Sequence, residues 1–157
     1  MDAVTFDARP YQHEGREPFA YIMKALEDVK DGQSFILVNT FDPRPLEAVM
    51  EARGYAYTVE KLADDHYVVT FTQTPEAQRG ELPIVDRREM APDKMVFQIA
   101  GVLRRMRRGE TFVVWVTDIP QANMLNVIKT AGATIEEDAG WTGDGHRLKI
   151  VREHPTH

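Results

Sequence analysis

Ionisable side chains crowd one short segment of the sequence, residues 7–19, which reads DARPYQHEGREPF. Asp7, Arg9, His13 and Arg16 all lie in this segment, just ahead of a predicted helix. Free backbone N–H groups at a helix N-terminus favour anions, and arginine and histidine add positive charge. The segment therefore predicts a site for a small anionic ligand or for an acidic stretch of a partner protein.

Two further residues belong to the same candidate site. Asp42 and Arg44 begin the second predicted helix, and a β-α-β arrangement places that helix start at the same edge of the sheet as the first segment. Two structural roles compete with binding: Asp42 as the cap of its helix, and an ion pair between Asp7 and Arg9. A catalytic alternative pairs His13 with Asp7 or Asp42 as acid and base.

A run of arginines, LRRMRRGE, closes a later predicted helix. The run contains four arginines, Arg104, Arg105, Arg107 and Arg108. Arginines clustered in this way can contact phosphates, which makes RNA binding one candidate function. Against it, cations are favoured at helix C-termini in any case, no aromatic residue is interleaved, and the net charge of the chain is −6. A solvated helix end is the stronger interpretation, and we do not expect nucleic acid as a partner.

The composition excludes several classes of chemistry. The chain of 157 residues has no cysteine, so disulfides, thiolate metal sites, thiol nucleophiles and persulfide carriers are excluded. Its five histidines are scattered and no nucleotide-binding fingerprint occurs, so we expect neither a metal nor a cofactor. No apolar run approaches the roughly 20 residues that span a bilayer, which predicts a cytoplasmic protein without membrane contact.

The elements that must position the candidate residues occur twice. Residues 31–43, DGQSFILVNTFDP, align without a gap with residues 108–120, RGETFVVWVTDIP, when Gly32 is set on Gly109. Upstream of each stretch lie a short strand ending in Asp-x-Arg and an amphipathic helix. Downstream lie a second helix that ends at a glycine and two more strands. The sequence therefore predicts two copies of one β-α-β-α-β-β unit.

The second copy repeats part of the candidate site. Asp86 and Arg88 end its first strand as Asp7 and Arg9 end theirs, and Asp118 precedes its second helix. We therefore include all three among the candidate binding residues.

The repeat also predicts the domain organisation and the fold class. We expect a first domain over residues 1–74, a polar linker over residues 75–82 and a second domain over residues 83–157. Each domain is predicted to be a two-layer α/β sandwich, a four-stranded mixed sheet with both helices on one face. Because the central strands are apolar on both alternating faces, we expect the uncovered sheet faces to pack on each other or on a second chain, as a homodimer.

The second copy carries a family motif in TDIPQANMLNVIKTAGATIEE, a D-x-P-x-A helix start formed by Asp118, Pro120 and Ala122. In this it resembles the TusA/SirA-like family of small bacterial sulfur carriers. The family carries its persulfide on a C-P-x-P motif at the start of the first helix, and here that segment, residues 90–95, reads MAPDKM. The resemblance therefore implies the fold of a carrier that has lost its sulfur chemistry.

The first copy shows the pattern D-x-R, a Pro-Phe helix start, V-N-x-x-D-P-x-P-L and R-G. The matching residues are Asp7, Arg9, Pro18, Phe19, Val38, Asn39, Asp42, Pro43, Pro45, Leu46, Arg53 and Gly54. This pattern resembles a related bacterial family of unknown function, number 2249. A histidine often precedes the D-P pair in those relatives, and Phe41 stands there in this chain, so a metal or acid–base role of that histidine is not implied.

The leading hypothesis for function follows from the resemblance and from the missing cysteine. In the carriers, partner enzymes dock around the start of the first helix, which implies a docking surface at residues 86–97 and residues 7–19. We predict a non-enzymatic binding, regulatory or accessory module of bacterial metabolism, with a protein or a small anion as its partner. The alternative is an enzyme or enzyme subunit of sulfur or nitrogen-oxide metabolism that uses His13 with Asp7 or Asp42.

Overall fold

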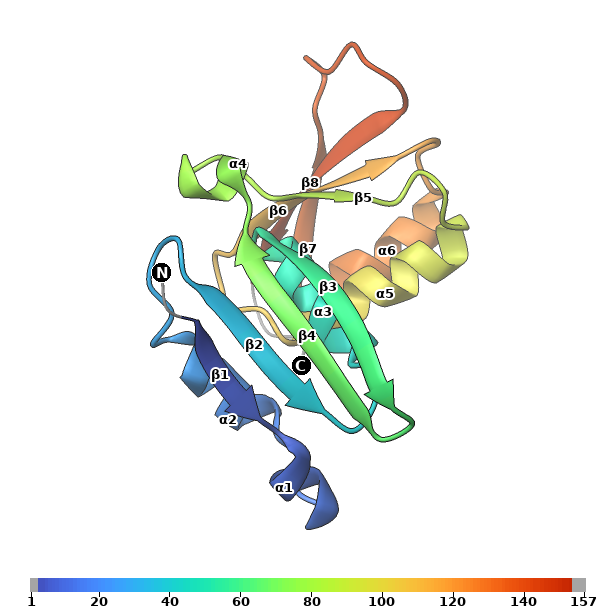
Figure 1. Ribbon diagram of the computed structural model, residues 1–157. Helices are drawn as coiled ribbons and strands as arrows, with labels where there is room; N and C mark the ends of the chain where they lie inside the picture. The colour runs from blue at the N-terminus through green and yellow to red at the C-terminus, as the bar shows by residue number, and fades with distance from the viewer. Residues whose placement is uncertain (1–2, 154–157) are drawn as a thin grey trace.

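The computed structural model describes residues 3–153, which form two units of the same topology (Figure 1). The first unit contains β1 (Val4–Asp7), α1 (Arg9–His13), α2 (Phe19–Leu26), β2 (Ser34–Asn39), α3 (Arg44–Ala52), β3 (Tyr55–Ala63) and β4 (His66–Gln73). After α4 (Pro75–Gln78), the second unit contains β5 (Ile84–Asp86), α5 (Pro92–Arg104), β6 (Thr111–Val116), α6 (Ala122–Thr130), β7 (Ala133–Glu137) and β8 (His146–Arg152).

The two sheets share one strand order. Sheet A runs β1-β2-β4-β3 and sheet B runs β5-β6-β8-β7. In each sheet the first pair of strands is parallel and the other two pairs are antiparallel. This confirms the predicted fold class, a mixed four-stranded sheet with helices against it. The duplicated stretches of sequence become β2 and β6, the second strand of each sheet.

The predicted helix ends are also present. Gly54 and Gly132 follow α3 and α6 with φ of +93° and +100°, a left-handed conformation that residues with a Cβ rarely adopt. Two short helices lie outside the predicted pattern. The segment of residues 7–19, expected as a loop, contains α1, and the predicted linker contains α4, whose N-cap Thr74 accepts a hydrogen bond from the amide of Ala77 at 3.1 Å.

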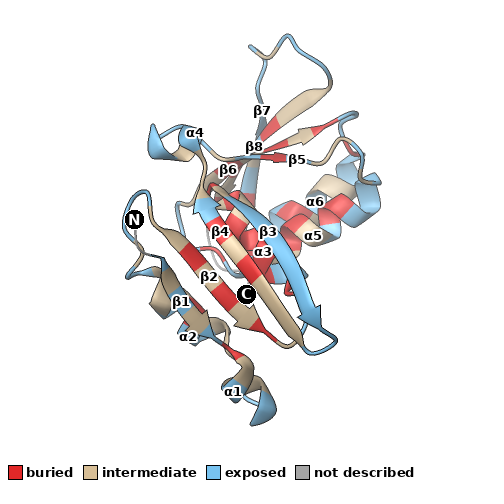
Figure 2. Ribbon diagram, in the orientation of Figure 1, coloured by how far each residue is buried: buried red, intermediate tan, exposed pale blue. Residues whose placement is uncertain are grey.

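Alternating burial explains the order of the layers (Figure 2). On β2, Phe35 and Leu37 are fully buried and point to the side of α2 and α3, with Ile22 and Met50 in the same core. The other face of sheet A carries no described helix or strand and is turned toward the viewer in Figure 1. Helices therefore cover one face of the sheet, as the sequence predicted.

The units pack through α3 and not through the open faces of their sheets, so that expectation is wrong for packing within the chain. Ala48, Val49 and Ala52 of α3 belong to the hydrophobic core of the second unit, next to α5 and sheet B. Leu46 and Met50 of the same helix belong to the core of the first unit. Because α3 is apolar on both sides, it buries surface in both units at once. Packing of an open face on a second chain stays a prediction.

The open face of sheet B is covered in part by its own side chains, which explains the apolar residues on both faces of β6. Trp115 meets Trp141 edge to face, with ring centroids 5.5 Å apart. Arg88 stacks on Trp115 at 3.5 Å, and Arg147 stacks on Trp141 at 3.5 Å. Both indole N–H groups donate to the carbonyl of Asp144. These contacts hold the loop before β8 over the sheet.

Within the described part of the chain, every helix is too short or too polar to cross a membrane.

Candidate functional site

An apolar hollow of the first unit lies where the parallel strands β1 and β2 end. Its volume is about 480 Å³, and we call it the edge cleft. Its lining consists of Gln12, residues 15–19, Ile22, residues 39–41, Pro43, Pro45, Leu46 and Arg105. Apolar walls come from the starts of α2 and α3, whereas Arg105 reaches in from the second unit. Clefts at the carboxyl ends of parallel strands are common binding sites in α/β proteins.

An amide network forms the polar floor of the edge cleft. Gln12 Oε1 accepts hydrogen bonds from the backbone N–H and the hydroxyl of Thr40, at 3.0 Å and 2.9 Å. Gln12 Nε2 donates to Asn39 Oδ1, and Asn39 Nδ2 donates to the carbonyl of Phe41 at 2.8 Å. Asn39 is only 1% exposed. The network therefore locks α1 against the loop between β2 and α3 and fixes the shape of the cleft.

Two arginines of the lining differ in their partners. Arg16 forms an ion pair with Glu14 at 2.9 Å and lies over the ring of Tyr11. The Arg105 guanidinium lies 5.5 Å from the centroid of Phe19 and has no acidic partner among residues 3–153. Arg105 is therefore the cation of this cleft that is available to an anion.

At the start of α3, the carboxyl group of Glu47 is buried beside that of Asp42, whose side chain is 30% exposed. Glu47 is 4% exposed, and neither Glu47 Oε2 nor Asp42 Oδ1 receives a hydrogen bond from a nitrogen or hydroxyl donor of the described residues. Burial, followed by the hydrogen bond to Asp42 and its charge, raises the pKa of Glu47 to about 8. The raised pKa keeps the Glu47 carboxyl group protonated at neutral pH. Asp42 does not cap α3, whose N-cap is Pro43 without a side-chain hydrogen bond, so that expectation is wrong.

The predicted ion pair between Asp7 and Arg9 is present and occurs twice. Arg9 donates through Nε and Nη2 to the two carboxylate oxygens of Asp7, at 3.0 Å and 2.9 Å. Arg88 donates to Asp86 in the same way, at 3.0 Å and 2.8 Å. The arginine hydrogen bond lowers the pKa of Asp7 and of Asp86. Each arginine is thus bound by the aspartate at the end of the strand that precedes it.

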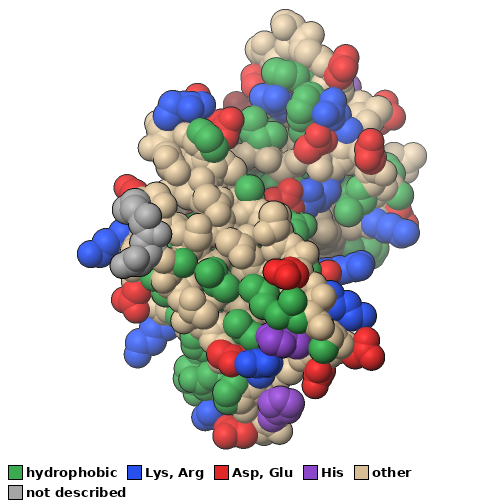
Figure 3. All heavy atoms as spheres, in the orientation of Figure 1, with side chains coloured by type: hydrophobic (Ala, Val, Ile, Leu, Met, Phe, Trp, Pro, Cys, Tyr) green, Lys and Arg blue, Asp and Glu red, His purple; other side chains and the backbone are tan. Residues whose placement is uncertain are grey.

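The structure separates residues that the sequence had suggested as one cluster. Asp7, Arg9 and His13 line a hollow of about 350 Å³ together with Asp65 and His66. This hollow is distinct in its lining from the edge cleft, where Arg16 lies. In Figure 3, histidine side chains gather over this end of sheet A, near α1 and the turn between β3 and β4.

The histidine of the catalytic alternative is exposed and makes no hydrogen bond to Asp7 or to Asp42 within the described structure. Among residues 3–153, no group of three or more histidine and acidic side chains is arranged to hold a metal ion.

Residues 5–73 match the family described as Uncharacterized conserved protein (DUF2249). No curated protein matches the chain. The match confirms the resemblance of the first copy and covers the sheet of the first unit except for Val4, the first residue of β1. It also covers every residue of the edge cleft except Arg105, which belongs to the second unit. The cleft therefore lies within the matched segment, apart from Arg105, which the second unit contributes.

The second unit has a smaller hollow at the equivalent place. Arg88 and Asp118 line it at the ends of β5 and β6, and its volume is about 260 Å³. These two predicted residues are thus brought together, whereas Asp86 is engaged by Arg88 on the open face of sheet B. Arg44, at the start of α3, lies on the side of the first unit that faces α5 and is 3.6 Å from Asp42.

The arginine run contributes one residue to the edge cleft. Arg107 forms an ion pair with Glu27 at 3.4 Å, and its backbone N–H donates to Glu110. Arg104 and Arg108 are exposed and, like Arg105, have no acidic partner in the described part of the chain. That these arginines form a solvated helix end rather than an RNA-binding site stays a prediction.

Sequence reasoning missed three residues of the site, Gln12, Thr40 and Glu47. The two polar residues gave no signal because their partners are far away along the chain. Glu47 had a weak signal, since it lies between Leu46 and Ala48 in a helix with apolar residues on more than one side. That pattern indicates a helix buried all round, in which an acidic side chain loses its water.

Proposed function

We propose that the protein is a non-enzymatic binding module whose edge cleft takes a ligand with a carboxylate on an apolar body. The observation that carries the proposal is Arg105, an arginine without an acidic partner in the described structure, at the rim of an apolar cleft. A guanidinium binds a carboxylate through charge-assisted hydrogen bonds, and apolar walls supply the remaining affinity.

The polar groups of the cleft favour binding over catalysis. Gln12, Asn39 and Thr40 are hydrogen-bonded to one another or to the backbone. Glu17, the one carboxylate among the described lining residues, accepts a hydrogen bond from the backbone N–H of Phe19 at 3.0 Å. The described lining holds no histidine, so no acid–base pair is positioned against a bound ligand.

The same proposal includes the origin of the chain by domain duplication and its location in the cell. Residues 1–74 and 83–157 are two copies of a carrier-like domain, of which the second is TusA-like and has lost the cysteine. Identical strand order in the two sheets supports this duplication. We propose a cytoplasmic accessory role in which the chain presents its cleft to a ligand or partner of bacterial metabolism.

Three small probes test the proposal by NMR chemical-shift titration of the full chain. Phenylacetate has both an apolar ring and a carboxylate, acetate lacks the ring, and benzyl alcohol lacks the charge. We expect phenylacetate alone to shift the amides of Gly15, Thr40 and Arg105, with a Kd in the millimolar range, about 0.3 kcal/mol for each of its non-hydrogen atoms.

Two matched variants locate the binding. Arg105→Gln removes the proposed anion contact, whereas Arg104→Gln removes an adjacent exposed arginine outside the cleft lining. The first variant is expected to weaken phenylacetate binding about tenfold and the second to leave it unchanged. Equal binding of benzyl alcohol, or equal binding to wild type and Arg105→Gln, would contradict the proposal.

A further inference from the structure

A second hollow adjoins the edge cleft on the side of α5. This second hollow, about 310 Å³ in volume, is lined by Arg44, Ala48, Phe97 and Gly101 among others. Pro45 and Arg105 line both hollows. The two hollows therefore adjoin each other at Pro45 and Arg105, and we call them together the interunit groove.

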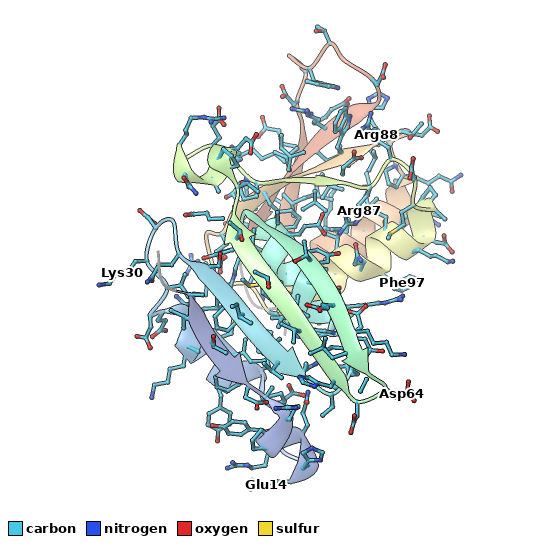
Figure 4. The ribbon with its side chains drawn as sticks, viewed as in Figure 1. Glu14, Lys30, Asp64, Arg87, Arg88 and Phe97 are labelled. Atoms are coloured by element: carbon cyan, nitrogen blue, oxygen red, sulfur yellow. The ribbon has the colours of Figure 1, made fainter. Side chains whose placement is uncertain are left out.

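Large aromatic side chains are exposed along both parts of the groove. Phe41, in the edge cleft, is 54% exposed, and Phe97, in the second hollow, is 70% exposed. Phe97 projects outward from α5 (Figure 4). Exposed aromatic rings beside a groove are typical of surfaces that bind a partner.

Gly101 is an independent indication that a bound chain lies close to α5 in the second hollow. It lies in the interior of α5, where glycine is about 1 kcal/mol less favourable than alanine. Its φ is not positive, and open space lies where a Cβ would be, with no heavy atom within 4 Å. Nothing within the described fold therefore requires glycine here. A glycine at an open groove leaves room for the backbone of a bound chain.

The charges of the groove select an acidic partner. Its lining contains three arginines, Arg16, Arg44 and Arg105, and one acid, Glu17. Arg16 and Arg44 have acidic neighbours in Glu14 and Asp42, but the side chain of Arg44 is 85% exposed and its contact with Asp42 is 3.6 Å long. This positive lining stands out on a chain whose net charge is −6.

We propose that the interunit groove binds an extended, acidic peptide segment of a partner protein. An apolar side chain of the segment enters the edge cleft, an acidic side chain meets Arg105, and the backbone passes over Gly101 beside Phe97. This proposal rests on the proposed function, because it uses the same cleft and the same arginine. It adds the class of partner and the second half of the binding surface.

A random library of twelve-residue peptides displayed on phage, selected against the immobilised full chain, is the test. We expect enrichment of peptides in which aspartate or glutamate flanks phenylalanine, tyrosine, tryptophan or leucine. The best enriched peptide, labelled with fluorescein, is then titrated by anisotropy. Arg105→Gln is expected to weaken it about tenfold, and Arg104→Gln is the control that leaves it unchanged.

Gly101→Gln separates this inference from the proposed function. Glutamine favours a helix more than glycine does and fills the second hollow, so the variant keeps its fold and its edge cleft. We expect it to weaken the peptide at least tenfold and to leave phenylacetate binding unchanged. Peptide binding that survives Gly101→Gln would overturn the inference while phenylacetate binding still supports the proposed function.

Other outcomes also decide the inference. Selection of neutral or basic peptides, or of none, would overturn it. A concentration-dependent dimer that Phe97→Asp dissolves would assign the groove to a second copy of the chain, and would overturn it as well.

Discussion

Arg53, at the end of α3, forms a two-pronged ion pair with Glu110 of the second unit. Its Nε donates to Oε2 at 3.0 Å and its Nη2 donates to Oε1 at 3.1 Å. A second pair joins Glu51 of α3 to Arg87, which donates to both carboxylate oxygens at 2.7 Å and 3.1 Å and lies between the units in Figure 4. The ion pairs join the units along the helix whose apolar residues enter both cores.

We expect Arg53→Met to lower the free energy of unfolding by about 2 kcal/mol, because Glu110 then remains largely buried without its partner. The side chains of this pair are only 17% and 27% exposed. Arg79→Met is the matched control, since the pair of Arg79 with Glu81 is 60% and 56% exposed and should contribute less than about 0.5 kcal/mol. Urea unfolding of both variants measures the difference, and equal losses would contradict this account of the junction.

Stability should depend on pH through Glu47. Its pKa is raised from an ordinary 4.5 to about 8, so the folded chain holds a proton that the unfolded chain has lost. Stability therefore falls between these two values as the pH rises, by about 1.4 kcal/mol per pH unit where the two states differ by one proton.

Glu47→Gln should remove this part of the pH dependence, because the glutamine N–H donates to Asp42 at every pH. Unfolding by urea at about pH 6 and about pH 9 is the measurement. We expect the wild type to lose about 3 kcal/mol more than the variant over this interval. The exposed Glu27→Gln serves as the control, and parallel pH profiles for wild type and Glu47→Gln would show that the carboxyl pair is not the cause.

The first unit, although it is the part that matches DUF2249, should self-associate when it is produced without the second unit. A chain that ends at residue 81 leaves Ala48, Val49 and Ala52 uncovered, and all three are at most 5% exposed in the full chain. We expect this fragment to self-associate in gel filtration and Val49→Lys to make it monomeric, because the lysine breaks the apolar face. A monomeric unsubstituted fragment would contradict the role of α3 as a shared helix.

Gly54 should tolerate alanine worse than Gly109 does. Both have positive φ, +93° and +91°, so backbone strain of about 1–2 kcal/mol is common to the two substitutions. A Cβ at Gly54 would lie 2.6 Å from the Cβ of Ala77, whereas none of the described atoms lies within 4 Å of one at Gly109. Thermal unfolding of Gly54→Ala and Gly109→Ala should therefore differ, with the larger loss at Gly54. Equal melting temperatures would mean that α4 moves aside without cost.

Local patterns predicted the elements and several contacts correctly. Asp-x-Arg at a strand end places donor and acceptor two residues apart, so the pair of Asp7 with Arg9 forms from local geometry alone. The same holds for Gly54, because a helix end needs a residue that accepts positive φ. The placement of His13 and Arg16 was not predictable in this way. They are three residues apart, yet α1 turns them toward different hollows.

The sequence by itself determined the repeat, the succession of helices and strands within each unit and the absence of cysteine chemistry, since these depend on periodicity and composition. Only the tertiary structure decided that α3 is shared between the cores, that Glu47 is buried beside Asp42 and that Arg105 completes a cleft of the other unit. The physical reason is that these features join residues from separate elements. The energies of these contacts depend on how the two units pack against each other. The hydrophobic periodicity within each unit does not predict that packing.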